Sequence, residues 1–84
     1  MTASTPLGRE FGERLRQRRT DRGLTQAALA RESQVHWTLI GQLERGERRP
    51  GLRTLLSIAY GLDVPPGELL DDTPPELFLR DQLG

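Results

Sequence analysis

The segment VHWTLIGQLERGERRPG, at residues 35–51, contains the side chains of this chain best suited to hydrogen-bond recognition. On a helix with about 100° per residue and Ile40 turned inward, the side chains of Thr38, Gln42 and Arg45 lie together on the opposite side. A hydroxyl, an amide and a guanidinium placed side by side can bind a planar polar group such as a nucleotide base, or a phosphate. The alternative interpretation is an ordinary solvated helix face.

Two unusual residues flank this polar face. Trp37 is the only tryptophan, and Gly41 follows it one helical turn later. Glycine inside a helix costs roughly 1 kcal/mol relative to alanine, so we expect it to make room. The space would serve either the indole, lying along the helix, or the close approach of a nucleic acid. Trp37 itself has three interpretations: an apolar contact with a nucleic acid, packing against the preceding helix, or the anchor of a protein-binding patch.

Helical spacing of apolar residues and capping residues place this segment in the third of five short helices. The first begins near Leu7 and ends at Gly23, and the second begins after Thr25. The third covers 36–45, and a short fifth helix begins at the prolines of VPPGELL. The fourth is expected to end at Gly61 and to turn four residues inward: Leu52, Leu55, Leu56 and Ala59.

No stretch alternates as a β-strand does, so we predict an all-α fold, a compact five-helix bundle. Only a few residues separate the second and third helices, which is typical of a helix-turn-helix. We expect a loose arm at residues 1–6, the helical domain at 7–72 and a C-terminal extension at 73–84.

Composition narrows the class of protein. The chain has 84 residues, no cysteine and no apolar run near the ~20 residues that span a bilayer. The start, MTASTPLGRE, lacks the apolar centre of a signal peptide, so we expect one cytoplasmic domain without a membrane partner.

Charge is distributed unevenly although the net charge is zero. Residues 1–53 hold 11 arginines and 6 acids, whereas residues 54–84 hold 1 arginine and 6 acids. Such asymmetry predicts one face for a polyanion and another that faces away from it. All twelve basic residues are arginine, which favours bidentate contact with phosphate or guanine, although a GC-rich genome produces the same bias.

Catalytic and metal-binding chemistry is not predicted. His36 is the only histidine and is expected to be a weak helix cap, and no cysteine exists to complete a metal site. Asp71 and Asp72 are adjacent on a polar tail, and no nucleophile has a neighbouring base. We therefore expect neither an enzyme nor a cofactor.

An ordered set of landmarks resembles the Cro/repressor-type helix-turn-helix family, the lambda-repressor-like or XRE proteins. The resemblance runs from about Phe11 to Leu70 and rests on these positions in order: Leu24-Thr25-Gln26, Leu29-Ala30, Val35, Ile40, Glu44, Gly46, Pro50, Leu55, Ala59, Leu62, Val64 and Leu69-Leu70. The sequence departs from the family pattern at four places: Gln34 instead of glycine, His36 instead of Ser or Thr, Trp37, and Gly41.

The resemblance implies a sequence-specific, double-stranded DNA-binding transcription regulator, often a dimeric repressor that binds an inverted repeat. Its third helix would enter the major groove and read bases through Trp37, Thr38, Gly41 and Gln42. Phosphates would be held by Thr25, Gln26, Arg45, Arg48, Arg49 and Arg53. A structural ion pair is implied between Arg19 and Glu44. The remaining arginines of the first helix are expected to form a solvated face.

The C-terminal extension leaves alternatives open. Its apolar residues either fold back on Leu7 and Phe11 or form a homodimer contact: Leu77, Phe78, Leu79 and Leu83. Two other functions also stay open. One is a protein-interaction module on the same fold, and the other is an antitoxin or controller component that binds DNA and a protein partner through the acidic C-terminal half.

Overall fold

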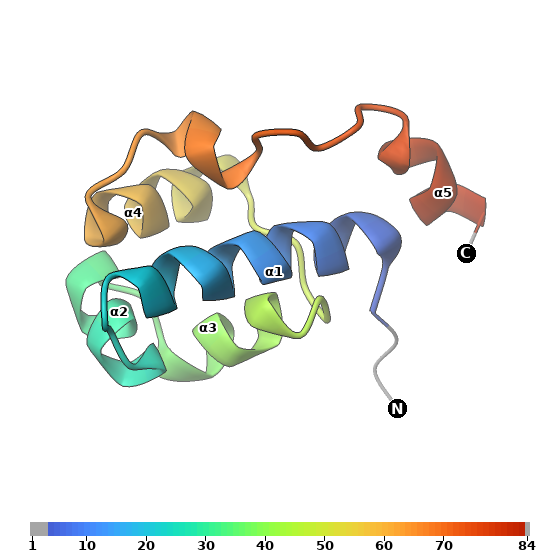
Figure 1. The fold of residues 1–84 in the computed structure, drawn as a ribbon. Coiled ribbons are helices and arrows are strands. Elements are labelled where there is room, and N and C mark those ends of the chain that lie inside the picture. The colour runs from blue at the N-terminus through green and yellow to red at the C-terminus, as the bar shows by residue number, and fades with distance from the viewer. Residues whose placement is uncertain (1–3, 84) are drawn as a thin grey trace.

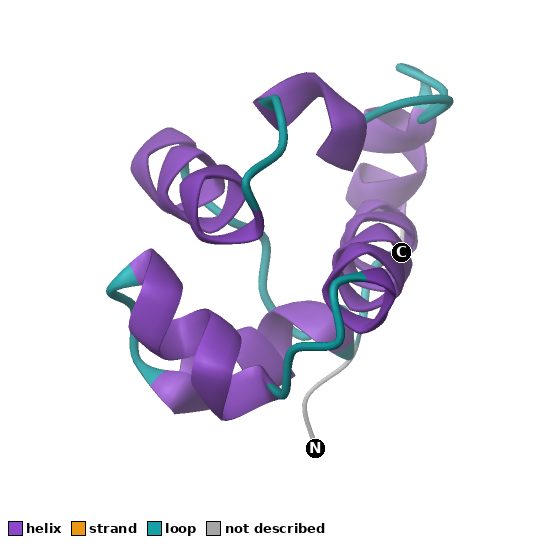
Figure 2. Cartoon of the chain, turned by 60° about the vertical axis from the view of Figure 1, so that its left-hand side comes forward, coloured by secondary structure: helices purple, strands orange, loops and turns teal. Residues whose placement is uncertain are grey.

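The computed structural model describes residues 4–83, and these form helices and loops without a strand (Figures 1 and 2). Five α-helices follow one another: α1 (Pro6–Asp21), α2 (Gln26–Ser33), α3 (Trp37–Glu44), α4 (Leu52–Leu62) and α5 (Leu77–Leu83). A 3-10 helix, η1 (Pro66–Leu69), lies between α4 and α5. The predicted all-α class is confirmed. The predicted short fifth helix is this 3-10 turn, and α5 in the extension is an additional helix.

The start of α1 differs from the prediction of a loose arm at residues 1–6. Thr5 caps the helix, because its hydroxyl accepts a hydrogen bond from the Gly8 amide at 3.0 Å, and Pro6 is the first helical residue. Proline suits this position because its fixed φ is helical and no amide hydrogen is needed there. The arm boundary is therefore wrong for Thr5 and Pro6, and residues 1–3 lie outside the described residues.

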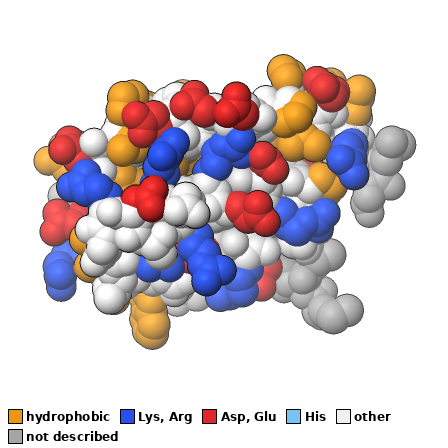
Figure 3. Space-filling model, viewed as in Figure 1, with side chains coloured by type: hydrophobic (Ala, Val, Ile, Leu, Met, Phe, Trp, Pro, Cys, Tyr) orange, Lys and Arg blue, Asp and Glu red, His pale blue; other side chains and the backbone are white. Residues whose placement is uncertain are grey.

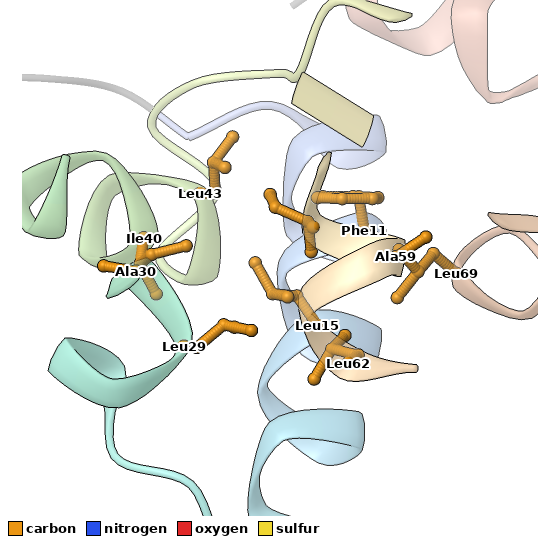
Figure 4. Packing of buried hydrophobic residues seen from close by; sticks show 10 residues of the cluster. Phe11, Leu15, Leu29, Ala30, Ile40, Leu43, Ala59, Leu62 and Leu69 are labelled. Atoms are coloured by element: carbon orange, nitrogen blue, oxygen red, sulfur yellow. The ribbon is translucent and has the colours of Figure 1, made fainter. Parts of the chain in front are cut away.

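One apolar core joins the first four helices (Figure 4). Phe11 and Leu15 of α1 face residues of α2, α3 and α4, and Leu69 closes the core from η1. The full set of buried residues in this cluster is Phe11, Leu15, Leu29, Ala30, Ile40, Leu43, Ile58, Ala59, Leu62 and Leu69. Because α3 has only eight residues, it is too short to be stable alone, and this core holds it in place.

Close backbone contact fixes α3 against α1. A Cβ atom at Gly12 of α1 would collide with the backbone of α3, at the carbonyl oxygens of Leu43 and Glu44, the second of them only 2.5 Å away. Glycine at this position therefore allows the two helices to approach more closely than any other residue would. The position of α3 relative to α1 follows from that contact.

Helix α4 is oriented differently from the prediction. Ala59 is buried and Leu55 is half-buried, but Leu52 and Leu56 are 74% and 50% exposed. The inward face is instead centred on Ile58, Ala59 and Leu62. The helix also continues past Gly61 to Leu62. Its cap is Asp63, which adopts a left-handed φ of 57°.

The C-terminal extension folds back on the start of the chain, and α5 packs against α1. Leu77 is buried there, whereas Phe78 and Leu79 remain about half exposed. The Asp81 carboxylate accepts a hydrogen bond from the Leu7 amide at 2.9 Å. Leu77 is therefore buried against its own chain, and the side chain of Leu83 lies outside the described residues.

Candidate nucleic-acid interface

Helices α2 and α3 form a helix-turn-helix with a three-residue turn at 34–36. Thr25 caps α2, since its hydroxyl accepts from the Ala28 amide at 3.0 Å. Gln34 adopts a left-handed φ of 57°, so it makes the turn that glycine would make, at a cost of roughly 1–2 kcal/mol. His36 caps α3 through Nδ1, which accepts from the Thr38 amide at 3.3 Å.

The outward face of α3 is exposed as its sequence periodicity predicted. Ile40 and Leu43 are fully buried, while Thr38 and Arg45 are exposed and Gln42 is partly exposed. The Trp37 side chain is 62% exposed. That exposure argues against the interpretation that Trp37 packs against α2, and it makes an aromatic surface available beside the polar residues.

Gly41 has a different surrounding from the one predicted. The residue is buried, and the side chains of Arg45 and Gln26 cover it. A Cβ atom at position 41 would lie 3.0 Å from Arg45 Nη1 and 3.6 Å from Gln26 Oε1. The room at Gly41 is therefore used by the arginine and the glutamine and not by the Trp37 indole. Gly41 itself is too covered to read a base in this arrangement.

The Glu44 carboxylate joins three helices. It receives two hydrogen bonds from Arg19 of α1, Nε to Oε2 at 2.5 Å and Nη2 to Oε1 at 3.0 Å. The Gln26 amide of α2 donates to Oε1, also at 3.0 Å. The side chains of Arg19 and Glu44 are 13% and 5% exposed. Hydrogen bonding to this carboxylate raises the pKa of Arg19, so its guanidinium remains charged.

Gln26 is held at the interface by the same carboxylate. One hydrogen of its amide nitrogen is donated to Glu44, and the second hydrogen remains available to a ligand. The first backbone amides of α2 also lack helical acceptors, as at any helix start. Amide hydrogens and a fixed side-chain amide at one point form a donor group suited to a phosphate oxygen.

Arg45 and Glu47 form an ion pair next to this group. Arg45 Nε donates to Glu47 Oε2 at 2.8 Å, and Nη2 donates to Oε1 at 3.2 Å. The hydrogen bonds lower the pKa of Glu47 and raise that of Arg45. Glu47 was not predicted as a site residue, although its position two residues after Arg45 was the available signal.

The other predicted phosphate-binding arginines fall into two groups. Arg49 donates to Asp81 of α5 at 2.6 Å, so its guanidinium is partly engaged within the chain. The hydrogen bond from the Leu7 amide is the main cause that lowers the pKa of Asp81, and the hydrogen bond from Arg49 lowers it further. Arg48 and Arg53 are exposed, and no ion pair reaches either one within the described side chains of residues 4–82.

Arginines of α1 are mostly paired with acids, in agreement with a solvated or structural face. Arg14 binds Glu10 at 2.5 Å, and Arg18 approaches Glu68 at 3.8 Å. Blue and red side chains alternate over α1 in Figure 3. The acidic C-terminal half therefore neutralises part of the basic N-terminal half within the chain itself.

Other site types find no support in residues 4–83. No three His, Asp or Glu side chains among them are grouped to bind a metal ion. None of the helices described combines the length and the apolar character that crossing a membrane requires.

The Glu44 contacts lead to a stability prediction. Replacing Glu44 with glutamine leaves the Arg19 guanidinium without its counter-ion in a largely buried place, which we expect to lower the free energy of unfolding by about 3–5 kcal/mol. Urea unfolding measures the loss. The matched control is Glu10→Gln, which removes the surface partner of Arg14 and should lower stability by about 1 kcal/mol or less. Equal small losses in both variants would contradict the role given to Glu44.

Comparisons with known proteins agree with this geometry. A family model described as a helix-turn-helix domain matches residues 10–72. Control protein C.BamHI of Bacillus amyloliquefaciens is 39% identical over 64 residues, which cover 75% of this chain and 79% of that protein. The HTH-type transcriptional regulator SutR of Escherichia coli (strain K12) is 41% identical over 59 residues, 70% of this chain, and the match spans only 33% of that regulator.

A solved structure adds agreement in three dimensions. The restriction-modification controller protein C.AhdI from Aeromonas hydrophila superposes with a TM-score of 0.72 at 42% identity, covering 74% of this chain and 94% of that chain. Sequence landmarks, helix order and these relatives agree. The chain belongs to the helix-turn-helix family of DNA-binding transcriptional regulators, of the Cro/repressor or XRE type.

Proposed function

We propose that this protein binds duplex DNA as a homodimer, with α3 of each copy in the major groove of one half of an inverted repeat, and that it represses transcription by occupying a promoter in the cytoplasm. The observation that carries the proposal is the outward face of α3, where Trp37, Thr38, Gln42 and Arg45 are accessible beside the donor group of Gln26. A short helix with its polar face free has the dimensions that the major groove accepts.

Base reading is assigned to three side chains of α3. Gln42 can form a bidentate contact with adenine, and Thr38 can meet a base edge or a thymine methyl. The exposed Trp37 indole can cover a thymine methyl or a sugar at the groove edge. Gly41, predicted as a base-reading position, contributes space for Arg45 and Gln26 instead of a contact of its own.

Phosphate binding is assigned to residues at the start of α2 and to arginines that follow α3. Thr25, Gln26 and the first amides of α2 bind one backbone strand, and Arg48 and Arg53 bind the other. Arg49 can bind a phosphate as well if its hydrogen bond to Asp81 breaks. These contacts position the protein on the duplex without specifying a sequence.

Homodimer formation is assigned to the exposed side of α4. Leu52, Leu56 and Tyr60 are spaced by four residues, so they share one side of the helix, and they are 74%, 50% and 80% exposed. In an antiparallel crossing of two copies, Leu56 can meet its counterpart while Leu52 meets the partner's Tyr60. Exposed apolar rows of this kind are typical of protein contacts. Phe78 and Leu79 of the extension are the alternative contact.

DNA recognition can be tested with a random duplex library incubated with the full chain at low salt. We expect enrichment of an inverted repeat whose half-sites lie ~34–36 Å apart, and a weaker complex for Gln42→Ala. The logarithm of affinity should fall with the logarithm of salt by about 0.9 per phosphate contact. Failure to enrich any sequence, together with salt-independent binding to a protein, would favour the protein-interaction module.

The dimer surface can be tested by sedimentation velocity. Leu56→Glu places a charge in the middle of the α4 row, so we expect this variant to be monomeric at concentrations where the parent chain is dimeric. Phe78→Glu is the matched control and should remain dimeric. Dissociation of Phe78→Glu alone would move the contact to the C-terminal extension, and a monomeric parent chain would contradict the dimer.

A further inference from the structure

Within the part of the chain that the structure describes, Arg45 uses one edge of its guanidinium for hydrogen bonds. Its five N–H donors are arranged as a planar fork, and Glu47 accepts two of them, one from Nε at 2.8 Å and one from Nη2 at 3.2 Å. The two hydrogens on Nη1 and the second hydrogen on Nη2 remain. These lie on the far edge of the fork, so a second planar acceptor can bind there while Glu47 remains bound.

The place of this fork on α3 is set by what lies under it. Nη1 is above Gly41, where a Cβ atom would lie 3.0 Å from it, so a larger residue would force the guanidinium to shift by a few tenths of an ångström. Gln26 Oε1 also lies near Gly41, 3.6 Å from that Cβ position. Arg45 is thus confined on one side by Glu47 and has its free edge beside the exposed face of α3.

Glu47 has no evident reason to stand at a DNA interface as a stabilising residue. Surface ion pairs contribute little to folding, and a carboxylate near a duplex repels its phosphates. Its bidentate geometry does explain its presence if the function of the pair is orientation. A fork fixed by one carboxylate loses less rotational freedom when it binds a second acceptor.

We propose that Glu47 is a positioning residue that aligns Arg45 for bidentate hydrogen bonding to the O6 and N7 atoms of a guanine in the major groove, with Gly41 leaving the space that this alignment needs. The free Nη1–Nη2 edge matches these two acceptors, which is the commonest specific contact of arginine with DNA. Arg45, predicted among the phosphate contacts, then reads a base. This inference rests on the proposed function and adds a specificity determinant to it.

The experiment starts from the duplex that the full chain enriches from a random library. Each base pair of that duplex is replaced in turn, and affinity is measured for the parent chain and for Arg45→Lys, which keeps the charge and loses the fork. We expect one base pair of each half-site at which the parent prefers guanine by roughly 10- to 100-fold and Arg45→Lys does not.

Glu47→Gln then tests the positioning role at that base pair. We expect the preference for guanine to fall to a few-fold, while binding to duplexes without the site becomes equal or tighter because a negative charge is lost. Glu32→Gln, on the exposed surface of α2, is the matched charge control and should keep the full preference. In the Arg45→Lys background, Glu47→Gln should change the preference no further.

Gly41→Ala provides a second test that does not alter charge. Alanine favours the helix, so the variant should fold at least as well by thermal unfolding, yet it should lose preference for guanine at the same base pair. The proposal is overturned if Glu47→Gln and Gly41→Ala both retain the parent preference, or if no guanine depends on Arg45. Enrichment of a site with these results overturns the inference alone, whereas the absence of any enriched site overturns the proposed function as well.

Discussion

The buried carboxylate of Glu44 is the constraint on which the position of the reading helix depends. An eight-residue helix is marginal by itself, so α3 takes its orientation from its contacts. Glu44 fixes the end of α3 to Arg19 of α1 and to Gln26 of α2, and the close approach at Gly12 leaves α1 and α3 little freedom to slide. The orientation of the exposed face of α3 is thus fixed by these buried contacts.

Several residues of α3 and of the turn before it are unfavourable for the stability of the fold. Gln34 adopts a left-handed backbone, Gly41 stands inside a helix, and Trp37 leaves most of its side chain in water. Each of these choices is unfavourable for folding alone. They share one helix and the turn before it, which is where sequences are expected to depart from folding rules for the sake of binding.

Sequence periodicity was sufficient to predict α1 to α4 and the outward face of α3, because Ile40 and Leu43 define the inner side of α3 without ambiguity. It failed on α4, where leucines occur on more than one side of the helix, so the pattern could not decide between Leu52 or Leu56 and Ile58. Only the packing of α4 against α2 and η1 decides that orientation. The additional helix α5 was hidden by prolines and acids that resemble a tail.

Long-range ion pairs were the other part that the sequence could not reveal. Asp81 binds Arg49 from 32 residues away, and nothing in either segment indicates the other. The Arg19–Glu44 pair was expected only through resemblance to a family, since its partners lie 25 residues apart. The ion pair between Arg45 and Glu47 is different, because the two residues are close in sequence. Their spacing alone predicted no role for Glu47, and only the geometry of the two hydrogen bonds suggests one.

We propose that the exposed face of α3 meets DNA, and Trp37 reports on this face directly because it is the only tryptophan. Acrylamide quenching of its fluorescence should be measured while a labelled duplex is added and its binding is followed by anisotropy. We predict that quenching falls in step with binding, since the duplex would cover a side chain that is 62% exposed in the free protein. Saturation of the duplex with no change in quenching would place DNA on another face of the protein and contradict the assignment of α3 as the reading helix.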